Sequence, residues 1–392
     1  MTEKQDKIIF AVAIALSVIG LIMILSVSTL SEIQELSLSF TKFFKQVVWY
    51  IVGISVLAIV SKINFRIYQT YSGLILGVGF FLLILVLAVG SRKQGALRWI
   101  DFGFMSFQPI MFVKMAVVIY VADRLSRKRQ DLSDYSKGLA PFLIVLLPFL
   151  FLIIMQPDYS NAVLLIGVVF IMLLMSPIPV SHLMVTGLMG LIPLIGLILY
   201  KPYRMQRIQE FFQNGADLKG SQVGHALIAL GSGGFWGNGY AASKMKLFFL
   251  QAADTDFIMA ILGEEFGLIG VSIVLFLFLV LFIRMLRIIS RSQDMFQYYL
   301  AIGLMSILFL NFTVNIGVVL NILPTTGVPL PFISYGGSHL LGEFLIIGIM
   351  LSISEQISDK KLSVVNEKVS VAYATKKKSK VRTGKIHGVR KY

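Results

Sequence analysis

Long apolar runs separated by short polar segments dominate the pattern of this chain. Each run is about 20 residues long, the length of an α-helix that crosses a bilayer. Because backbone polar groups inside a bilayer must be paired within the chain, such runs predict transmembrane helices. The pattern predicts ten spans, near residues 8–30, 44–61, 70–90, 105–123, 139–155, 161–177, 181–200, 264–284, 298–320 and 333–354.

The breaks between the runs set the predicted organisation. Pro157 and Asp158 divide the fifth span from the sixth, and Pro177 and Pro179 mark the next tight turn. The first run has no small-residue cleavage site, so we expect a retained span rather than a removed signal peptide. The sequence therefore predicts an all-α polytopic membrane protein over residues 1–358. A large outer loop, about 201–263, joins the seventh and eighth spans.

The composition agrees with a membrane protein and excludes some kinds of catalytic chemistry. Hydrophobic residues make up 57% of the 392 residues and charged residues 14%, against about a quarter charged in soluble domains. The chain has no cysteine, which excludes disulfides and thiolate chemistry. Much of the net charge of +15 lies in residues 359–392. We expect that tail to be a disordered cytoplasmic end rather than a nucleic-acid arm, and contact with anionic membrane lipids is compatible with this.

The loop charges predict the orientation of the chain. With the N-terminus inside, the inner segments hold about twice as many Lys and Arg residues as the outer loops, as the positive-inside rule expects. The chain is thus predicted to be a multi-pass plasma-membrane protein with both termini cytoplasmic. The long outer loop interleaves basic and aromatic residues, which suits a surface at headgroup level. Binding of an anionic lipid substrate and simple contact with the membrane would each explain this arrangement of basic and aromatic residues.

A few polar residues lie where the membrane makes them costly. Lys114 lies within the fourth span, so it either has a function or extends to the interface. Asp158 is either part of a site or a helix cap. No two histidines have the spacing of metal ligands on one helix, which argues against a histidine metal site.

Four of the 20 acidic residues cluster in AADTDFIMAILGEEFG, directly before the eighth span. Asp256 is a candidate general base, or alternatively a charge in the first turn of the coming helix. The segment between the last two spans, NFTVNIGVVLNILPTTGVPLPFISYGGSHLL, is rich in proline and glycine. Such irregular backbone lines a cavity or packs on protein, on the same outer side as Asp256.

These motifs, with GHALIALGSGGFWGNG, ALRWIDFGFMSFQP and QPDYSNAVLL, closely resemble those of the SEDS family, which covers FtsW, RodA and SpoVE. The resemblance spans nearly the whole chain. It implies a ten-helix fold and a glycosyltransferase that polymerises lipid II into glycan strands of peptidoglycan. The spacing from GSGGFWGNGYAASKMKLFFL to TDFI resembles the FtsW branch, which implies septal synthesis during cell division. A RodA-like elongation polymerase is the alternative.

The resemblance also implies residue roles. Asp256 matches the essential family aspartate and would deprotonate the sugar 4-hydroxyl of the acceptor, with undecaprenyl pyrophosphate as the leaving group. The basic residues that would balance this charge are Lys114, Arg204, Arg207, Lys244 and Lys246. Further substrate-binding candidates are Arg98 and Trp99 at the cavity wall, Asp158, and Ser334. A divalent cation, Mg²⁺ or Mn²⁺, would be an alternative charge balance, although the sequence shows no dedicated ligand set.

Five residues depart from the family pattern, among them Gln251 and Ala252, which replace proline and glutamate of the family's LPEAHTDF. Met111 stands where the family commonly has glutamate in SFQPSELAK, so the ion-pair partner of Lys114 is missing or lies elsewhere. Asp254 replaces a histidine and puts a second carboxylate near Asp256, which suits either a base or a metal-binding pair. His339 replaces a serine at the outer cavity.

Two other functions compete with the glycosyltransferase. A lipid II flippase would need a polar path to the cytoplasmic side, whereas the unusual polar residues lie mostly outside. A structural scaffold would explain the spans but not the charge around TDFI. The resemblance further implies a class B penicillin-binding protein as the transpeptidase partner, together with other divisome proteins.

Overall fold

The computed structural model of the protein describes residues 6–30, 39–93, 96–103, 105–127, 132–199, 221–250 and 252–357. The tail predicted at 359–392 lies outside these ranges. Arg204 and Arg207 of the long outer loop also lie outside them.

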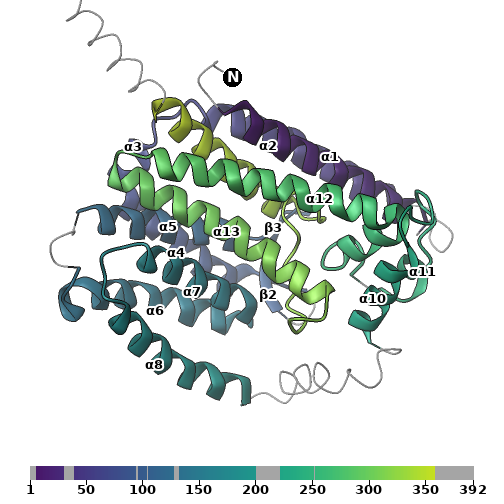
Figure 1. Cartoon of the computed structure of the whole chain (residues 1–392). Helices are drawn as coiled ribbons and strands as arrows, with labels where there is room; N and C mark the ends of the chain where they lie inside the picture. The colour runs from purple at the N-terminus through teal and green to yellow at the C-terminus, as the bar shows by residue number, and fades with distance from the viewer. Residues whose placement is uncertain are drawn as a thin grey trace, which may run out of the picture.

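Each predicted span coincides with a helix in the described part of the chain (Figure 1), which confirms the all-α polytopic fold. The helices are α1 (Lys7–Leu30), α2 (Ser39–Val60), α4 (Ser72–Val89), α5 (Ile110–Arg127), α6 (Ala140–Met155), α7 (Tyr159–Leu174), α8 (Val180–Leu199), α12 (Ile258–Arg291), α13 (Met295–Val319) and the C-terminal helix (Gly337–Ile357). Within those ranges, seven spanning candidates are long and apolar enough to cross a bilayer, and α7 and α8 are shorter apolar helices.

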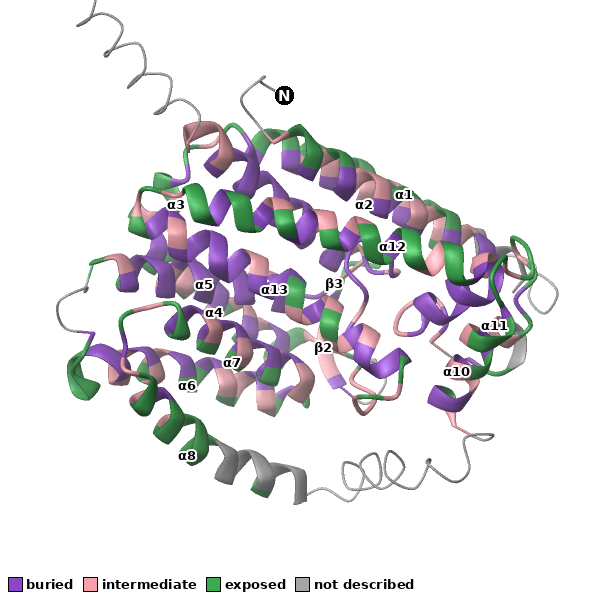
Figure 2. Ribbon diagram, viewed as in Figure 1, coloured by how far each residue is buried: buried purple, intermediate pink, exposed green. Residues whose placement is uncertain are grey.

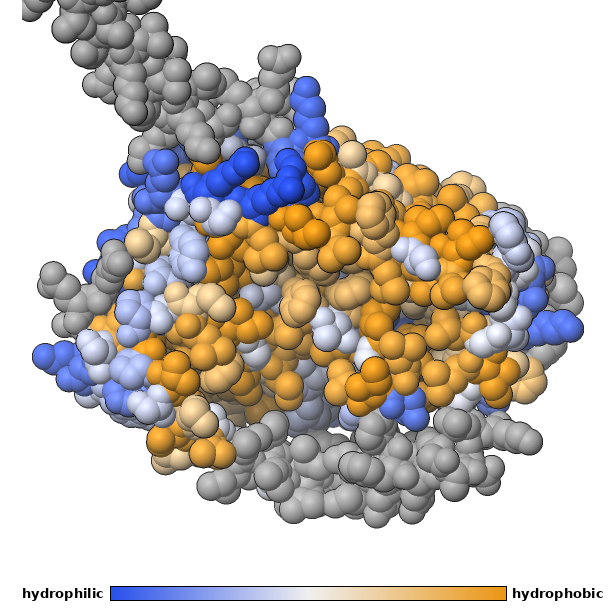
Figure 3. Space-filling model, in the orientation of Figure 1, coloured by the Kyte–Doolittle hydropathy of each residue, from blue (hydrophilic) through white to orange (hydrophobic). Residues whose placement is uncertain are grey.

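The bundle is apolar on its outside as well as in its core. Hydrophobic side chains cover the middle of the face in Figure 3, and hydrophilic residues gather towards its two ends. Phe81, Phe151 and Phe276 are among the exposed apolar side chains, which is what a surface in contact with lipid requires. The buried centre is formed mainly by α5, α13 and the C-terminal helix, whereas residues 180–190 of α8 are largely exposed (Figure 2).

The segment before α5 corrects a predicted boundary. We expected the fourth span to begin near residue 105, but a small antiparallel sheet occupies this region, in the order β1 (Ser91–Lys93), β2 (Ala96–Asp101), β3 (Ser106–Phe107). Pro109 then stands directly before α5, a position where its missing N–H leaves no helical bond unmade. The remaining short elements of the first half are α3 (Arg66–Thr70) and a π-helical turn, η2 (Tyr135–Leu139).

The described part of the long outer loop folds onto α12. It contains α10 (Gln222–Ser232) and α11 (Met245–Phe248), joined through a glycine-rich turn. Helix α12 is interrupted at Gly267, whose φ of 63° and ψ of −161° only glycine adopts readily. The glycine-rich turn supplies the missing bonds, because Asn238 N donates to Glu264 O and Leu268 N donates to Gly234 O, both at 2.9 Å.

Candidate active site

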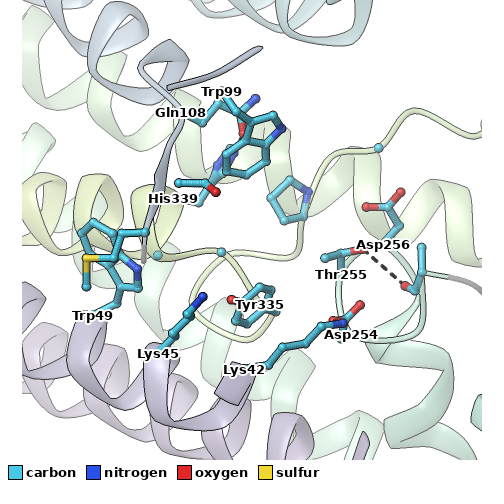
Figure 4. Close-up of a pocket in the computed structure, with 17 residues that line it drawn as sticks. Lys42, Lys45, Trp49, Trp99, Gln108, Asp254, Thr255, Asp256, Tyr335 and His339 are labelled. Atoms are coloured by element: carbon cyan, nitrogen blue, oxygen red, sulfur yellow. Dashed lines mark hydrogen bonds and ion pairs between the residues drawn. The ribbon is translucent and has the colours of Figure 1, made fainter. Parts of the chain in front are cut away.

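A polar pocket of about 460 Å³ opens between four parts of the chain. These are the start of α2, the β3 region, the turn 252–257 before α12, and the irregular segment 320–337 that leads into the C-terminal helix. Figure 4 shows the side chains that face one another across it. Its lining includes Lys42, Lys45, Trp49, Trp99, Gln108, Asp254, Asp256, Gly327, Tyr335 and His339.

Asp256 lines the polar pocket from the turn that precedes α12. The helix begins at Ile258 after Phe257, and no side chain caps it. The alternative prediction, in which Asp256 is a charge in the first turn of this helix, is therefore wrong. The turn keeps the carboxylate outside the regular helix, where it faces the pocket.

Backbone hydrogen bonds hold this turn against the irregular segment. Ser334 Oγ donates to Thr255 O at 2.6 Å, and Tyr335 N donates to Asp254 O at 2.8 Å. Asn315 Nδ2 donates both to Asp256 O at 3.0 Å and to Val328 O at 2.9 Å. The two segments, about 80 residues apart in sequence, thus form one wall. Ser334, predicted as a substrate-binding residue, acts here by holding the turn.

Gly327 brings the irregular segment close to the Asp256 carboxylate. Its φ is +72°, and a Cβ at this position would lie 3.8 Å from Asp256 Oδ2. The backbone therefore passes beside the carboxylate without a side chain between them, in a conformation that favours glycine.

Two lysines of α2 face the pocket, and sequence reasoning missed both. Lys42 Nζ is 2.7 Å from Asp254 Oδ2 and lies 5.9 Å from the ring centre of Tyr335. Lys45 lines the same pocket one helical turn later. Burial, and to a smaller extent the Asp254 carboxylate, raise the pKa of Tyr335, so its hydroxyl keeps its proton. The i, i+3 spacing of the two lysines was the available signal, but sequence alone did not show which helix faces the aspartates.

The pocket wall opposite the two α2 lysines carries Trp99 and His339. Trp99 comes from β2, as predicted for the cavity wall. Gln108 N donates to Ser338 Oγ at 2.9 Å, and the Gln108 side chain bonds to His339 Nε2 at 3.1 Å. His339 therefore lines the pocket in a fixed orientation.

Lys114 lies in a buried network that does not line the polar pocket. Its side chain is 1% exposed, so it does not extend to the interface. Lys114 Nζ donates to Asn161 Oδ1 at 3.1 Å and to Asn311 Oδ1 at 3.4 Å. Asn161 Nδ2 in turn donates to Asp158, whose Oδ1 is 3.5 Å from Arg98 Nη1. Asp158 occupies the cap position of α7 but makes no capping bond, so its role is electrostatic rather than that of a cap.

The predicted lysines of the long outer loop lie elsewhere. Lys246 Nζ forms a buried ion pair with Glu265 Oε1 at 2.5 Å and also bonds to Ser26 of α1. Burial lowers the pKa of Lys246 despite the opposing effect of Glu265. Lys244 is exposed, and its backbone N donates to Glu264 Oε1 at 2.9 Å. The structure therefore does not bring these lysines to Asp256.

The His, Asp and Glu side chains within the described ranges do not form a metal site. No group of three or more His, Asp or Glu side chains there is placed to hold an ion. Asp254 and Asp256 share the pocket, but Asp254 is already paired with the Lys42 ammonium. The residues described therefore do not fit a resident Mg²⁺ or Mn²⁺.

The chain matches one known protein family over most of its length. The family model for FtsW, RodA and SpoVE, described as cell cycle protein, matches residues 6–359. The chain is 34% identical over 361 residues to stage V sporulation protein E of Bacillus subtilis, covering 90% of this chain and 99% of that protein. It is 36% identical over 359 residues to the probable peptidoglycan glycosyltransferase FtsW of Coxiella burnetii, covering 90% and 96%.

Two solved structures share the fold at low sequence identity. A chain from a peptidoglycan synthase complex aligns with a TM-score of 0.74 and 23% identity, covering 90% of this chain and 98% of that one. The crystal structure of rod shape determining protein RodA from Thermus thermophilus aligns with a TM-score of 0.67 and 23% identity, covering 89% and 96%.

Proposed function

This chain belongs to the FtsW, RodA and SpoVE family of cell cycle proteins, and from that premise we propose how its polar pocket works. The chain is a peptidoglycan glycosyltransferase of the septal, FtsW type and a multi-pass membrane protein. Relatives that carry the FtsW name match about nine-tenths of its length at 33% to 36% identity. The proposal concerns its substrate and the residues that carry the reaction.

The proposed substrate is lipid II, which enters the polar pocket as the acceptor beside a growing, lipid-linked strand. Asp256 takes the proton from the 4-hydroxyl of the acceptor sugar, and the resulting oxygen attacks the anomeric carbon of the strand. The bond from that carbon to the pyrophosphate oxygen breaks as the new bond forms. Inversion gives a β-1,4 link, and undecaprenyl pyrophosphate leaves with the electron pair.

The pocket offers cations for the charge that develops on the leaving group. Lys42 and Lys45 line it on the α2 side, while Lys114 lies buried behind it. Ammonium groups held in a partly dehydrated pocket stabilise developing negative charge more strongly than water does. Asp256 is the proposed base because it lines the pocket from a turn whose backbone is held in place, whereas Asp254 is paired with Lys42.

The observation that carries this assignment is the way the base is held. The backbone on and beside Asp256 is fixed by hydrogen bonds from Asn315, Ser334 and Tyr335, and the carboxylate itself faces a cavity. A base held in place before the substrate binds needs little reorganisation in the transition state. A turn that served only to start a helix would need no such support.

The direct test uses purified protein and labelled lipid II. We expect glycan polymer from the wild type and none from Asp256→Asn, which keeps the shape of the side chain but cannot accept the proton. Asp254→Asn is the matched control, because it removes a carboxylate from the same wall and should leave most of the activity. Equal polymer from wild type and Asp256→Asn would remove Asp256 from the mechanism.

A second assay separates synthesis from transport. In proteoliposomes, a flippase would move labelled lipid II across the membrane without forming polymer. We expect polymer from the wild type and no movement that depends on Asp256. Depletion in the host then distinguishes the cellular role: filamentous cells indicate division, and rounded cells indicate elongation.

The cellular setting completes the proposal. A class B penicillin-binding protein would be the transpeptidase partner at the septum, with other divisome proteins around it. A solved chain of the same fold comes from a peptidoglycan synthase complex, which supports a partner of this kind. The positive-inside bias supports cytoplasmic positions for both termini. Crosslinking in cells between this chain and the partner's transmembrane helix would test the assembly.

A further inference from the structure

The charge balance around Lys114 is incomplete without a residue that the sequence did not single out. Lys114 and Arg98 are two cations of one buried network, and Asp158 is the carboxylate that lies 3.5 Å from Arg98. The direct partners of Lys114 Nζ are the amide oxygens of Asn161 and Asn311, which carry no charge. An ammonium buried in a protein interior is costly unless an opposite charge balances it.

Glu343 of the C-terminal helix lies beside the part of α5 that carries Lys114, because the neighbouring Gly342 packs against Met111, one turn before Lys114. Its side chain is 2% exposed, so a carboxylate there needs a cation such as Lys114 beside it, and the attraction between them is little screened by solvent. With Glu343 counted, Arg98 and Lys114 face two carboxylates, and the formal charge of the network becomes zero. The two groups form no direct ion pair, but Coulomb attraction in a dry interior extends beyond hydrogen-bond distance.

The packing of the C-terminal helix explains how Glu343 reaches this position. Gly342 lies against Met111 of α5, where a Cβ on the glycine would stand 2.3 Å from Met111 Cγ. Only glycine allows this approach, and it brings residue 343 to the side of α5 that carries Lys114 one turn after Met111. Met111 itself is fully buried and supplies no charge.

Glu343 also contacts the wall of the polar pocket. Its Oε2 accepts a hydrogen bond from Phe332 N at 2.7 Å. Phe332 has a φ of +63°, an unfavourable conformation for a side chain of this size, so the bond helps to hold a strained turn. That turn lies between Gly327, which passes beside Asp256, and Ser334, which holds the Asp256 turn.

We propose that Glu343 is a positioning residue that supplies, from the C-terminal helix, the carboxylate balancing Lys114 and ties that charge to the pocket wall beside Asp256. Its role in catalysis rests on the proposed function. Because the residue acts through the wall rather than on the substrate, its loss should slow the chemical step more than it weakens lipid II binding.

The test moves the carboxylate from one helix to the other. Glu343→Gln keeps an acceptor for Phe332 N but removes the charge, and we expect kcat to fall by about tenfold or more with KM changed by less than about twofold. Adding Met111→Glu to that variant places a carboxylate one turn from Lys114, and most of the lost kcat should return. Glu355→Gln is the matched control, since it lies on the same helix about 18 Å away along the axis and should leave kcat unchanged.

Two results would overturn the inference. A wild-type rate in Glu343→Gln would mean that the side chain serves only as a neutral hydrogen-bond acceptor. No recovery on adding Met111→Glu would mean that the charge is not what was lost.

A stability measurement keeps the inference separate from the proposed function. If the wild type makes no polymer, the proposed function fails, and the charge balance is then decided by a double-mutant cycle of Lys114→Met and Glu343→Gln in thermal unfolding. Coupling between the two changes, with the double variant more stable than the sum predicts, supports the pairing. Strictly additive effects contradict it.

Discussion

Two pairs of carboxylates lie within twelve residues of each other, and the structure uses them in different ways. Asp254 and Asp256 line the polar pocket from a turn outside the regular helix. Glu264 and Glu265 lie inside α12 and are 2% and 1% exposed. Glu264 accepts bonds from Ser243 and from the Lys244 backbone, whereas Glu265 pairs with Lys246 and Ser26.

The difference teaches that acidic residues clustered in sequence do not by themselves mark a site. The two glutamates are surrounded by donors of the same protein, so their contribution is to hold the outer loop onto α1 and α12. The two aspartates face a cavity that a substrate can enter. The comparison predicts that changes at the aspartates affect the reaction, whereas changes at the glutamates affect the stability of the fold.

The largest expected effect is on the reaction at Asp256. Asp256→Asn should lower the polymerisation rate by about 10²–10⁴-fold, the usual contribution of a general base. The thermal midpoint in detergent should stay close to that of the wild type, because Asn315 and Ser334 hold this turn through backbone carbonyls that the substitution leaves in place. Measuring the polymerisation rate and the thermal unfolding of the same preparation checks both expectations. A destabilised but active variant would show that Asp256, like Glu264 and Glu265, stabilises the fold rather than serving the reaction.

The largest expected effect on stability is at Glu265. Glu265→Ala leaves Lys246 buried without its partner, which should cost roughly 3–5 kcal/mol of unfolding free energy. The double variant Lys246→Met with Glu265→Met should regain much of this loss, since an apolar pair of similar volume replaces the ion pair. Unfolding measurements on the three proteins check this, and a stable but inactive Glu265→Ala would contradict the division of roles.

A smaller loss is expected where the outer loop meets α12. Gly267→Ala introduces a Cβ that would stand 2.5 Å from Gly237 N, in a conformation that only glycine adopts readily. We expect a loss of about 1–3 kcal/mol of stability. Gly231→Ala is the control, because nothing lies within 4 Å of its added Cβ. Similar thermal midpoints for the two variants would show that the turn adapts.

The smallest effect is expected at the mouth of the polar pocket. The side chains of Lys42 and Asp254 are 56% and 13% exposed, so their ion pair should contribute no more than about 1 kcal/mol. Lys42→Met should therefore change the thermal midpoint little and lower the polymerisation rate by at most about fivefold. Combining it with Asp254→Asn tests the pair, since the second change should add almost nothing. A loss as large as that of Asp256→Asn would make Lys42 essential to the reaction.

Much of the fold followed from the chain pattern, because membrane insertion depends on local properties. Ten apolar runs gave ten helices, since run length and backbone pairing are decided within each segment. The three-stranded sheet before α5 was missed, because its strands are very short and are stabilised by pairing with each other. The extent of α12 was also underestimated, because the predicted span of 264–284 was set by the length that crosses a bilayer, whereas the helix continues beyond it at both ends.

The site was predictable only in part. The proline-rich segment was expected only on the same side as Asp256, and the structure brings it into direct contact with the TDFI turn. Lys42, Lys45 and Glu343 were missed, because each lies in an ordinary-looking helix whose facing direction depends on its neighbours. Lys246 was expected near the leaving group, yet the structure pairs it with Glu265.

The sequence by itself determined that this chain crosses the membrane, where its helices lie, and which family it resembles. These properties depend on the apolar content of each segment and on motifs read in order. Only the tertiary structure decided which charged groups face a cavity and which neutralise each other inside the bundle. That choice depends on contacts between residues far apart in the sequence, such as Ser26 with Glu265, which are 239 positions apart. The low dielectric of the interior makes such contacts decisive for where a charge can lie.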